Sequence, residues 1–328
     1  MTVHKSVLLE EAINNLNLEK GKIVVDATLG GGGHSLEILK KILPGGKLVV
    51  IDRDIEAIEN FRNKIKNDND NDNDNELIIE IGKDLILINS NFSDISRILE
   101  NEEIEKVDAI LADFGLSSDQ LADKERGFSF LQEGKLDMRM STGNTNDKDN
   151  LTAEDVVNDY SQEDLLRILR KYGEEKFAKR IVEKIIIERD KRKIKTTTEL
   201  VNIILEVVPE RYKRKKIHPA TKTFQALRIE VNEELKSIEK FIEDAVQKLK
   251  IGGRLVVISF HSGEDRIVKN IFKNLKTKCI CPPEFPICKC GKKAKIKIIS
   301  RKLIIANDEE ILKNPRSRSA KMRVVEKI

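Results

Sequence analysis

The chain has 328 residues, enough for two domains or for one large domain with an insert, and its 39% of hydrophobic residues exclude global disorder. No apolar run approaches the ~18 residues of a membrane span, and the N-terminus lacks a signal-peptide pattern, so we expect a cytoplasmic protein without a membrane partner. Four cysteines are too few for a disulfide scaffold, and the net charge of +4 is small for a chain that is 35% charged.

Strand and helix patterns alternate along the first third of the chain and recur near its end. The predicted strands are Lys22–Ala27, Lys47–Asp52, Leu85–Asn89, Val107–Asp113 and Arg254–Phe260. Helical patterns follow several of them, at Ser35–Ile42, at Ile55–Ile65 and from Glu264 onward. This alternation predicts an α/β fold with a parallel sheet and right-handed crossovers. Two further strands, Ala294–Leu303 and Met322–Ile328, would add an antiparallel edge.

A different pattern covers residues 116–212, where we find several helical segments and no convincing strand. We therefore predict a helical insert for substrate recognition, between an N-terminal part (1–115) and a C-terminal part (213–328) of the sheet domain. A long helix over Thr223–Leu249 would return the chain to the sheet. Glu174 and Glu175 are interpreted as a first helix turn, where carboxylates interact favourably with the helix dipole. The tract Asn67–Asn75 is a predicted surface loop, followed by a small hairpin over residues 76–88.

A glycine cluster, Gly30–Gly33, follows the first strand and opens the first helix. Glycines in this place let the backbone approach a ligand closely and leave a helix N-terminus facing it, which is typical of a nucleotide-type cofactor site. Ser35 occupies the place of the third glycine of a strict dinucleotide fingerprint, so a plain tight turn is the alternative. Asp52 ends the second strand, where a carboxylate can accept hydrogen bonds from ribose hydroxyls. Asp26 at the end of the first strand, together with the expected hairpin edge, favours S-adenosylmethionine over NAD as the cofactor.

Asp113 ends the fourth strand, and ligands of such sheets lie beyond the carboxyl ends of the strands. We therefore expect Asp113 beside both cofactor and substrate. The alternative is a helix N-cap, a role that Ser117 and Ser118 also suit. His34 and His261 follow predicted strands too, which distinguishes them from ordinary structural histidines.

The four cysteines form two Cys-x-Cys pairs with a Pro-Pro turn between them: Cys279, Cys281, Cys288 and Cys290. Four thiolates suit a structural, tetrahedral zinc site. The more common spacing in such sites is Cys-x-x-Cys, so reduced surface thiols are the alternative.

Positive charge is concentrated in three stretches. Gly291–Ile328 holds 12 Lys/Arg against 4 Asp/Glu, a second cluster runs from Arg211 to Lys222, and a third runs from Arg189 to Lys195. If these stretches fold together, they form a phosphate-binding surface, whereas ordinary solvated lysines are the alternative. The candidate RNA contacts are Arg214, Lys215, Lys216, Arg316, Arg318 and Lys321.

Together, the motifs resemble the bacterial small-subunit ribosomal RNA methyltransferases of the RsmH (formerly MraW) family, and the resemblance extends over nearly the whole chain. The matching blocks are His4–Glu11, Asp26–Ser35, Asp52–Asp54, Asn91–Ser93, Asp113–Leu121, Arg126–Phe130, Leu136–Met140, Tyr172–Ala178, His218–Arg228, Gly252–Arg266 and Asn314–Arg318. Phe114, Lys222 and Gly263 depart from the leucine, arginine and leucine that are usual in the family. The resemblance implies a class I, Rossmann-like sheet that binds S-adenosylmethionine, with adenine packed on Phe92. The implied contacts are Gly32, Gly33, His34, Asp52, Phe92, Asp113 and Gln120.

By the same resemblance, the substrate would be the N4 amine of cytosine 1402 in the decoding region of 16S rRNA, within the small ribosomal subunit. This conjugated amine is a poor nucleophile, so a hydrogen-bond acceptor on it would help the reaction. Asp113 is the first candidate for that role, followed by His261 and Asp137. Two other functions stay open at this point: an NAD-linked oxidoreductase, and an RNA-binding ribosome-assembly factor without catalysis.

Overall fold

The computed structural model describes residues 6–70, 78–141, 151–281 and 289–328, so His4 and Cys288 lie outside the described residues. The chain divides into two compact units. The sheet unit comprises the chain up to Gly115 and from Leu235 to Ile328, and the helical unit comprises Leu116–Glu234. The helical unit begins where the sequence predicts, but it continues past Tyr212 because α11 (Thr221–Asn232) contributes to its core.

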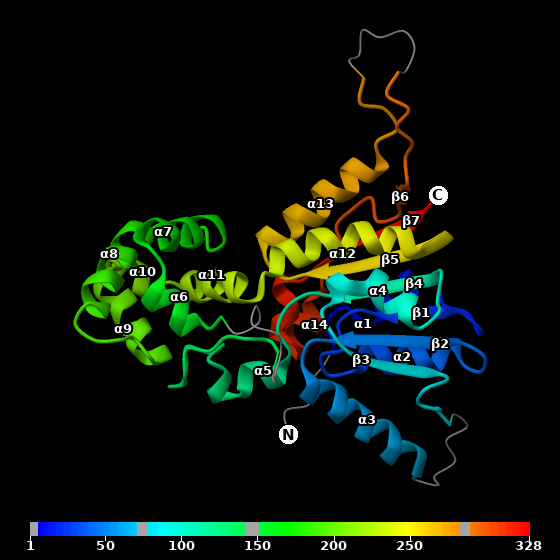
Figure 1. Cartoon of the computed structure of the whole chain (residues 1–328), viewed down its shortest axis with the longest axis horizontal. Coiled ribbons are helices and arrows are strands. Elements are labelled where there is room, and N and C mark those ends of the chain that lie inside the picture. Colours follow the sequence, from blue (N-terminus) through cyan, green and yellow to red (C-terminus); the bar gives the residue numbers. More distant parts are fainter. Residues whose placement is uncertain (1–5, 71–77, 142–150, 282–288) are drawn as a thin grey trace. The chain divides into compact units, whose positions relative to one another are not determined.

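In the described residues, the sheet unit contains one seven-stranded sheet of order β3-β2-β1-β4-β5-β7-β6 (Figure 1). The strands are β1 (Ile23–Asp26), β2 (Lys47–Asp52), β3 (Leu85–Asn89), β4 (Val107–Asp113), β5 (Leu249–Ser259), β6 (Ile296–Ile298) and β7 (Lys321–Lys327). The first five pair in parallel, whereas β7 runs antiparallel to both β5 and β6. The predicted parallel sheet with an antiparallel edge is confirmed.

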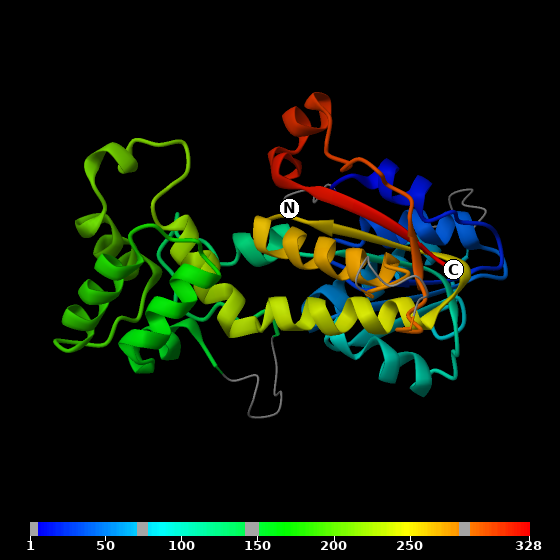
Figure 2. The same ribbon diagram turned by 90° about the horizontal axis from the view of Figure 1, so that it is seen from above.

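Helices cover both faces of this sheet, because successive side chains of each strand point to opposite faces. In β2, Leu48 and Val50 belong to one core, and Val49 and Ile51 belong to the other. The blue α1 and the yellow α12 accordingly lie on opposite sides of the sheet in Figure 2. The first core is covered by α1 (Leu9–Asn15), α2 (Gly33–Ile42) and α3 (Ile55–Asp70), and the second by α4 (Ile95–Asn101), α12 (Glu234–Lys248) and α13 (Ser262–Lys276).

Three predicted details of the sheet unit are wrong. Between Ile78 and Asn89 the one strand is β3 (Leu85–Asn89) rather than a hairpin, and Ile81 makes only an isolated parallel bridge with Leu85. The helix α3 continues to Asp70, into the tract that was expected to be a loop. The strand β6 covers only Ile296–Ile298, because the chain beyond it rejoins β7 through a single isolated bridge.

Short amphipathic helices build the helical unit around a core of its own. They are α5 (Ser118–Ala122), α6 (Ala153–Asp159), α7 (Gln162–Lys171), α8 (Ala178–Arg189), α9 (Thr197–Val207), α10 (Glu210–Lys213) and α11. Hydroxyl side chains start four of them: Ser117, Thr152, Ser161 and Thr196 each accept a hydrogen bond from the backbone N–H three residues later. In the parts of the chain that the structure describes, no helix has the length and apolarity to cross a membrane.

Two helix boundaries here differ from the prediction. The expected long helix over 223–249 is two helices, α11 and α12, because Glu233 between them adopts a left-handed conformation with φ of 49°. Glu174 and Glu175 precede α8 rather than forming its first turn. Glu174 is also left-handed, and the buried Glu175 accepts a hydrogen bond from the Phe177 N–H at 2.9 Å.

Candidate functional site

The glycine-rich loop joins β1 to α2, and close packing requires two of its glycines. Gly32 has a φ of +75°, and a Cβ there would lie 2.4 Å from the Phe61 ring. A Cβ on Gly33 would lie 2.2 Å from Ser6 Oγ. Because Phe61 and Ser6 fill the space where side chains would stand, only glycine allows the chain to make this tight turn into the N-terminus of α2.

Asp26 ends β1 beside this loop and is fully buried. Its carboxylate accepts hydrogen bonds from Ser35 Oγ at 2.6 Å and from the Thr28 N–H at 3.2 Å. Burial raises the pKa of Asp26 to about 7, and the nearby Asp52 carboxylate adds to the rise. Ser35, which breaks the glycine fingerprint, therefore has a specific role as the hydrogen-bond donor to a buried carboxylate.

Asp52 ends β2 at the same edge of the sheet, because β1 and β2 are parallel neighbours. One carboxylate oxygen accepts the Gly30 N–H at 3.1 Å and the other accepts the Asp54 N–H at 2.9 Å. Burial raises the pKa of Asp52 to about 6 against the opposing effect of these hydrogen bonds. Since an ionised carboxylate has about four acceptor sites, the side chain is oriented by the backbone and still able to bind ribose hydroxyls.

Asp113 ends β4, on the other side of β1. Its backbone N–H donates to Thr28 Oγ1 at 2.6 Å, and its buried Oδ1 atom has no hydrogen-bond partner among the described residues. Burial raises the pKa of Asp113 well above its usual range, and the charges of Asp26 and Glu264 add to this effect. A buried carboxylate oxygen without a donor is costly, so this atom suits a ligand that brings a hydrogen-bond donor or a positive charge.

His34, the second residue of α2, lies next to Asp113. Its Nε2 atom is 3.1 Å from the Val7 carbonyl oxygen, and because a carbonyl only accepts, Nε2 carries a proton. The other ring nitrogen, Nδ1, is 3.9 Å from Asp113 Oδ2. The imidazole is therefore oriented toward the carboxylate, at a distance longer than a hydrogen bond.

Phe92 follows β3 and is the partly exposed member of an aromatic cluster in the second core of the sheet unit. Its ring centroid lies 5.4 Å from that of Phe114 and 5.3 Å from that of Phe241, whose rings are buried. Phe114 thus supports Phe92 from behind. The half-buried Phe92 ring retains exposed surface on which a flat heterocycle can pack.

His261 has a structural role that the sequence did not reveal: it is the N-cap of α13. Its Nδ1 atom accepts the N–H groups of Gly263 at 3.1 Å and of Glu264 at 3.4 Å. Its Nε2 atom lies 3.2 Å from Glu264 Oε1. Both ring nitrogens face the first turn of its own helix, which leaves His261 poorly placed to act as a general base.

Gln120 and Asp137 belong to the helical unit. Gln120 completes a capping box with Ser117, so Ser117 rather than Asp113 is the N-cap of α5. Asp137 forms a bidentate ion pair with Arg139: Arg139 Nε donates to Asp137 Oδ1 at 2.8 Å and Nη2 donates to Oδ2 at 2.6 Å. Although burial opposes the effect, hydrogen bonds from Arg139 lower the pKa of Asp137. A carboxylate with a lowered pKa is a weak base, so the ion pair disfavours a catalytic role for Asp137.

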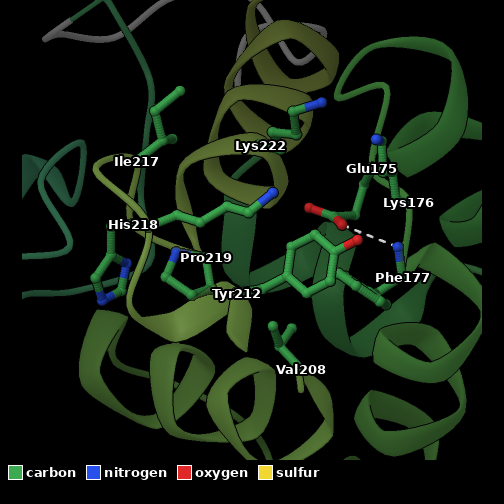
Figure 3. Close-up of a pocket in the computed structure, with 10 residues that line it drawn as sticks. Glu175, Lys176, Phe177, Val208, Tyr212, Ile217, His218, Pro219 and Lys222 are labelled. Atoms are coloured by element: carbon green, nitrogen blue, oxygen red, sulfur yellow. Dashed lines mark hydrogen bonds between the residues drawn. The ribbon is translucent and has the colours of Figure 1, made fainter. Parts of the chain in front are cut away.

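A pocket of about 220 Å³ opens in the helical unit. Figure 3 shows Tyr212 between Pro219 and Phe177, with His218 beyond Pro219 and Lys222 above them. The Tyr212 ring meets Phe177 edge-on, with centroids 4.8 Å apart, and Lys215 Nζ lies 4.3 Å from the Tyr212 centroid. Sequence reasoning did not find this pocket, because its residues come from two separate stretches of the chain, 175–177 and 208–222.

Exposed positive charges lie next to this pocket along the chain. Arg214, Lys215 and Lys216 follow α10 and are all exposed, as the sequence suggested for phosphate contacts. The stretch Arg189–Lys195 differs, because much of its charge is used within the unit. Arg189 donates to the Val157 and Tyr160 carbonyls, and Arg192 pairs with Glu199.

The basic C-terminal residues of the sheet unit are also not equivalent. Arg318 is exposed, whereas Arg316 and Lys321 are partly buried. Lys321 Nζ is 3.9 Å from Asp265 Oδ2, and this ion pair lowers the positive potential that Lys321 presents to solvent.

Three of the four cysteines, Cys279, Cys281 and Cys290, lie close together in the sheet unit.

Similarity to known proteins agrees with this geometry. A family model described as the MraW methylase family matches residues 1–328. Proteins named "Ribosomal RNA small subunit methyltransferase H" are similar over almost the whole length: that of Clostridium botulinum (strain Kyoto / Type A2) is 49% identical over 325 residues, 99% of each chain. That of Caldicellulosiruptor bescii is 48% identical over 328 residues, 100% of each chain, and that of Clostridioides difficile is 45% identical over 325 residues, 99% of each chain. The predicted family is therefore confirmed: this chain belongs to the MraW methylase family, and its sheet is a class I, Rossmann-like methyltransferase sheet with an inserted helical unit.

Proposed function

We propose that this chain transfers the methyl group of S-adenosylmethionine to the N4 amine of cytosine 1402 in small-subunit ribosomal RNA, a modification that supports accurate decoding. The observation that carries the proposal is the edge of the sheet where Asp26, Asp52 and Asp113 end three adjacent parallel strands beside a glycine-rich helix start. Family membership and the names of the relatives support the reaction class.

The residues present fit this cofactor. The raised pKa values of the three carboxyls reflect unfavourable burial of negative charge, which a cationic ligand relieves. Asp52 would bind the ribose hydroxyls, and Phe92 would pack on the adenine. Gly32, Gly33, His34 and Gln120 are proposed as further contacts. When bound, S-adenosylmethionine would supply an electrophilic methyl group on a sulfonium.

Asp113 is the proposed catalytic residue. Its Oδ1 atom would accept a hydrogen bond from the N4 amine and take the proton that the nitrogen loses as the new N–C bond forms. A carboxylate whose pKa is raised is a stronger base than an exposed aspartate, and such acid–base assistance contributes roughly 10²–10⁴-fold in rate. His261 and Asp137 are less suited, because one caps α13 and the other is paired with Arg139.

The helical unit would hold the RNA. Exposed Arg214, Lys215 and Lys216 would contact phosphates, and the aromatic rings of the pocket would contact unstacked bases. The alternative of an NAD-linked oxidoreductase is disfavoured by the antiparallel edge β5-β7-β6, which replaces the second nucleotide-binding half of a dinucleotide fold.

The test uses the full chain, small ribosomal subunits from a strain that lacks this activity, and methyl-labelled S-adenosylmethionine. Nuclease digestion and mass spectrometry should find N4-methylcytidine at one position of the 16S rRNA. Calorimetric titration with S-adenosylmethionine and with NADH tests the cofactor separately. Label at another base atom would refute the substrate assignment. Cofactor binding without any methylation, of either subunits or naked 16S rRNA, would favour a non-catalytic assembly factor.

A further inference from the structure

Three cysteine side chains converge in the segment that joins α13 to β6. Cys279, Cys281 and Cys290 have their sulfur atoms within 4.8 Å of one another. None forms a disulfide, and the Sγ atoms of Cys279 and Cys290 are 3.8 Å apart. A disulfide needs about 2.05 Å, so this spacing is not that of a bonded pair.

The spacing is that of ligands around one metal ion. In a tetrahedral site with zinc–sulfur bonds of about 2.3 Å, neighbouring sulfurs lie about 3.8 Å apart. The distance between Cys279 and Cys290 matches this edge of the tetrahedron. The third sulfur, of Cys281, lies within reach of the same centre after a small adjustment.

Each of the three sulfurs also accepts one backbone hydrogen bond. The Cys281 N–H donates to Cys279 Sγ at 3.4 Å, the Ile280 N–H donates to Cys290 Sγ at 3.5 Å, and the Lys289 N–H donates to Cys281 Sγ at 3.3 Å. Donors of this kind stabilise the negative charge of a thiolate and orient it toward a metal. The charge of the segment acts in the same direction, because residues 276–281 and 289–295 contain six lysines and no acidic residue.

Hydrophobic packing does not account for the convergence. Cys279 is exposed, and Ile280 beside it is 66% exposed. Where the segment begins and ends, next to α13 and β6, a hydrogen bond from the Lys295 N–H to the Leu275 carbonyl at 2.8 Å joins its two ends. Three thiols that meet in an exposed segment, each with a backbone donor, need another reason to be together.

We infer that Cys279, Cys281 and Cys290 bind one structural zinc ion that closes the segment between α13 and β6. A zinc ion held by three thiolates takes its fourth ligand from the chain or from water. The site is separate from the carboxylate site at the edge of the sheet, and it does not depend on the proposed reaction.

The experiment measures metal in the full-length chain, purified without an affinity tag from zinc-supplemented medium. We expect about one zinc per chain by mass spectrometry of the metal, and Co²⁺ exchanged into the protein should give thiolate-to-cobalt charge-transfer absorption. Cys279→Ser, Cys281→Ser and Cys290→Ser should each reduce the zinc content by at least severalfold. Ile280→Ser introduces the same residue between two of the ligands and should retain the metal.

The cobalt spectrum of the unaltered chain keeps the test decisive if a serine variant fails to fold. A protein that remains metal-free when Zn²⁺ or Co²⁺ is added in excess, with thiols that react as quickly as without metal, would overturn the site. Equal zinc content in the unaltered chain and in folded variants of all three cysteines would also overturn it.

Discussion

The two units of this protein present opposite electrostatics to their ligands. In the sheet unit, the buried Asp26 and the partly buried Asp52 and Asp113 place three carboxyls at one edge of the sheet, and burial raises the pKa of each. In the helical unit, Arg214 to Lys216 expose positive charge next to an aromatic pocket. The first arrangement suits a small cation, and the second suits an anionic polymer. On the proposed function, one chain would separate recognition of the methyl donor from recognition of RNA.

The units also differ in how their functional residues are held. Asp52 is fixed by two backbone N–H groups, and Asp26 by a hydroxyl and a backbone N–H. By contrast, the Tyr212 ring is held by an edge-on contact with the Phe177 ring and by a cation–π contact with Lys215 Nζ. We expect substitutions in the sheet unit to change cofactor affinity or rate sharply, and those in the helical unit to change RNA affinity gradually.

Asp113→Asn should give the largest effect, because it keeps the shape of the side chain and removes its basicity. We expect the methylation rate in single-turnover assays to fall by roughly 10²–10⁴-fold. Cofactor affinity, measured by calorimetry, should fall less. A variant with full activity would exclude Asp113 as the proton acceptor.

Asp52→Ala should weaken binding of S-adenosylmethionine while leaving the fold intact. Loss of hydrogen bonds to a charged acceptor costs about 2–4 kcal/mol, which is a rise of about 30-fold or more in the dissociation constant. Circular dichroism checks the fold and calorimetry the affinity. RNA binding serves as the internal control and should be unchanged. Normal cofactor affinity in a folded variant would contradict the assigned ribose contact.

The affinity for S-adenosylmethionine should rise with pH, from pH 5 to pH 7.5. Asp52 and Asp26 have pKa values of about 6 and about 7, so at low pH both are largely protonated and lose their attraction for a cation. We expect the dissociation constant to change about tenfold per pH unit for each proton that cofactor binding displaces.

The free energy of unfolding of the ligand-free chain should change in the opposite direction, falling as the pH rises. Raised carboxyl pKa values stabilise the folded state at low pH, and this contribution is lost as pH rises from about 3.8 through these values.

Asp26→Asn separates the contribution of Asp26 to this pH dependence from that of Asp52, since it removes one titrating group and keeps an acceptor for Ser35. Its cofactor affinity should depend less on pH than that of the unaltered chain. An equally steep dependence in the variant would assign the titration to other groups.

Neutralising the exposed cluster of the helical unit should reduce the salt dependence of RNA binding. In Arg214→Ala/Lys215→Ala/Lys216→Ala, loss of three phosphate contacts lowers the log–log slope by about 2–3. The matched variant Arg316→Ala/Arg318→Ala/Lys321→Ala should change the slope less, because Lys321 lies near Asp265 and Arg316 is partly buried. Filter binding at several salt concentrations measures both. An equal loss of slope in both variants would mean that the C-terminal residues contact as many phosphates as Arg214, Lys215 and Lys216 do.

Phe114→Leu should give the smallest effect. Leucine, the residue that the resemblance leads us to expect at this position, removes one ring that supports Phe92. Changes of this kind in a core usually cost under about 1.5 kcal/mol, so the dissociation constant of S-adenosylmethionine should rise less than about tenfold. Phe92→Ala, which removes the proposed adenine contact itself, should have the larger effect in the same calorimetric assay. The reverse order would place the adenine elsewhere.

The sequence by itself determined the order of strands and helices, and with it the edge of the sheet where Asp26, Asp52 and Asp113 end their strands. Side-chain period and strand–helix alternation are local, and parallel strands bring their carboxyl ends to one edge whatever surrounds them. Tertiary structure decided the roles of the histidines. His261 became a helix cap, and His34 is oriented by the carbonyl of Val7, 27 residues earlier in the chain.

Tertiary structure also decided where helices broke and which charges stayed available. Glu233 separates α11 from α12, where Asn232 donates to the Met138 carbonyl at 2.7 Å, a contact between residues 94 positions apart. Arg189 and Lys216 look alike in the sequence, yet one donates to carbonyls inside the helical unit and the other is exposed. Such outcomes depend on partners from distant segments, whose positions are set only when the cores pack. For that reason local pattern predicts where the carboxyls of the candidate site lie, but not how ring nitrogens and guanidinium groups are used.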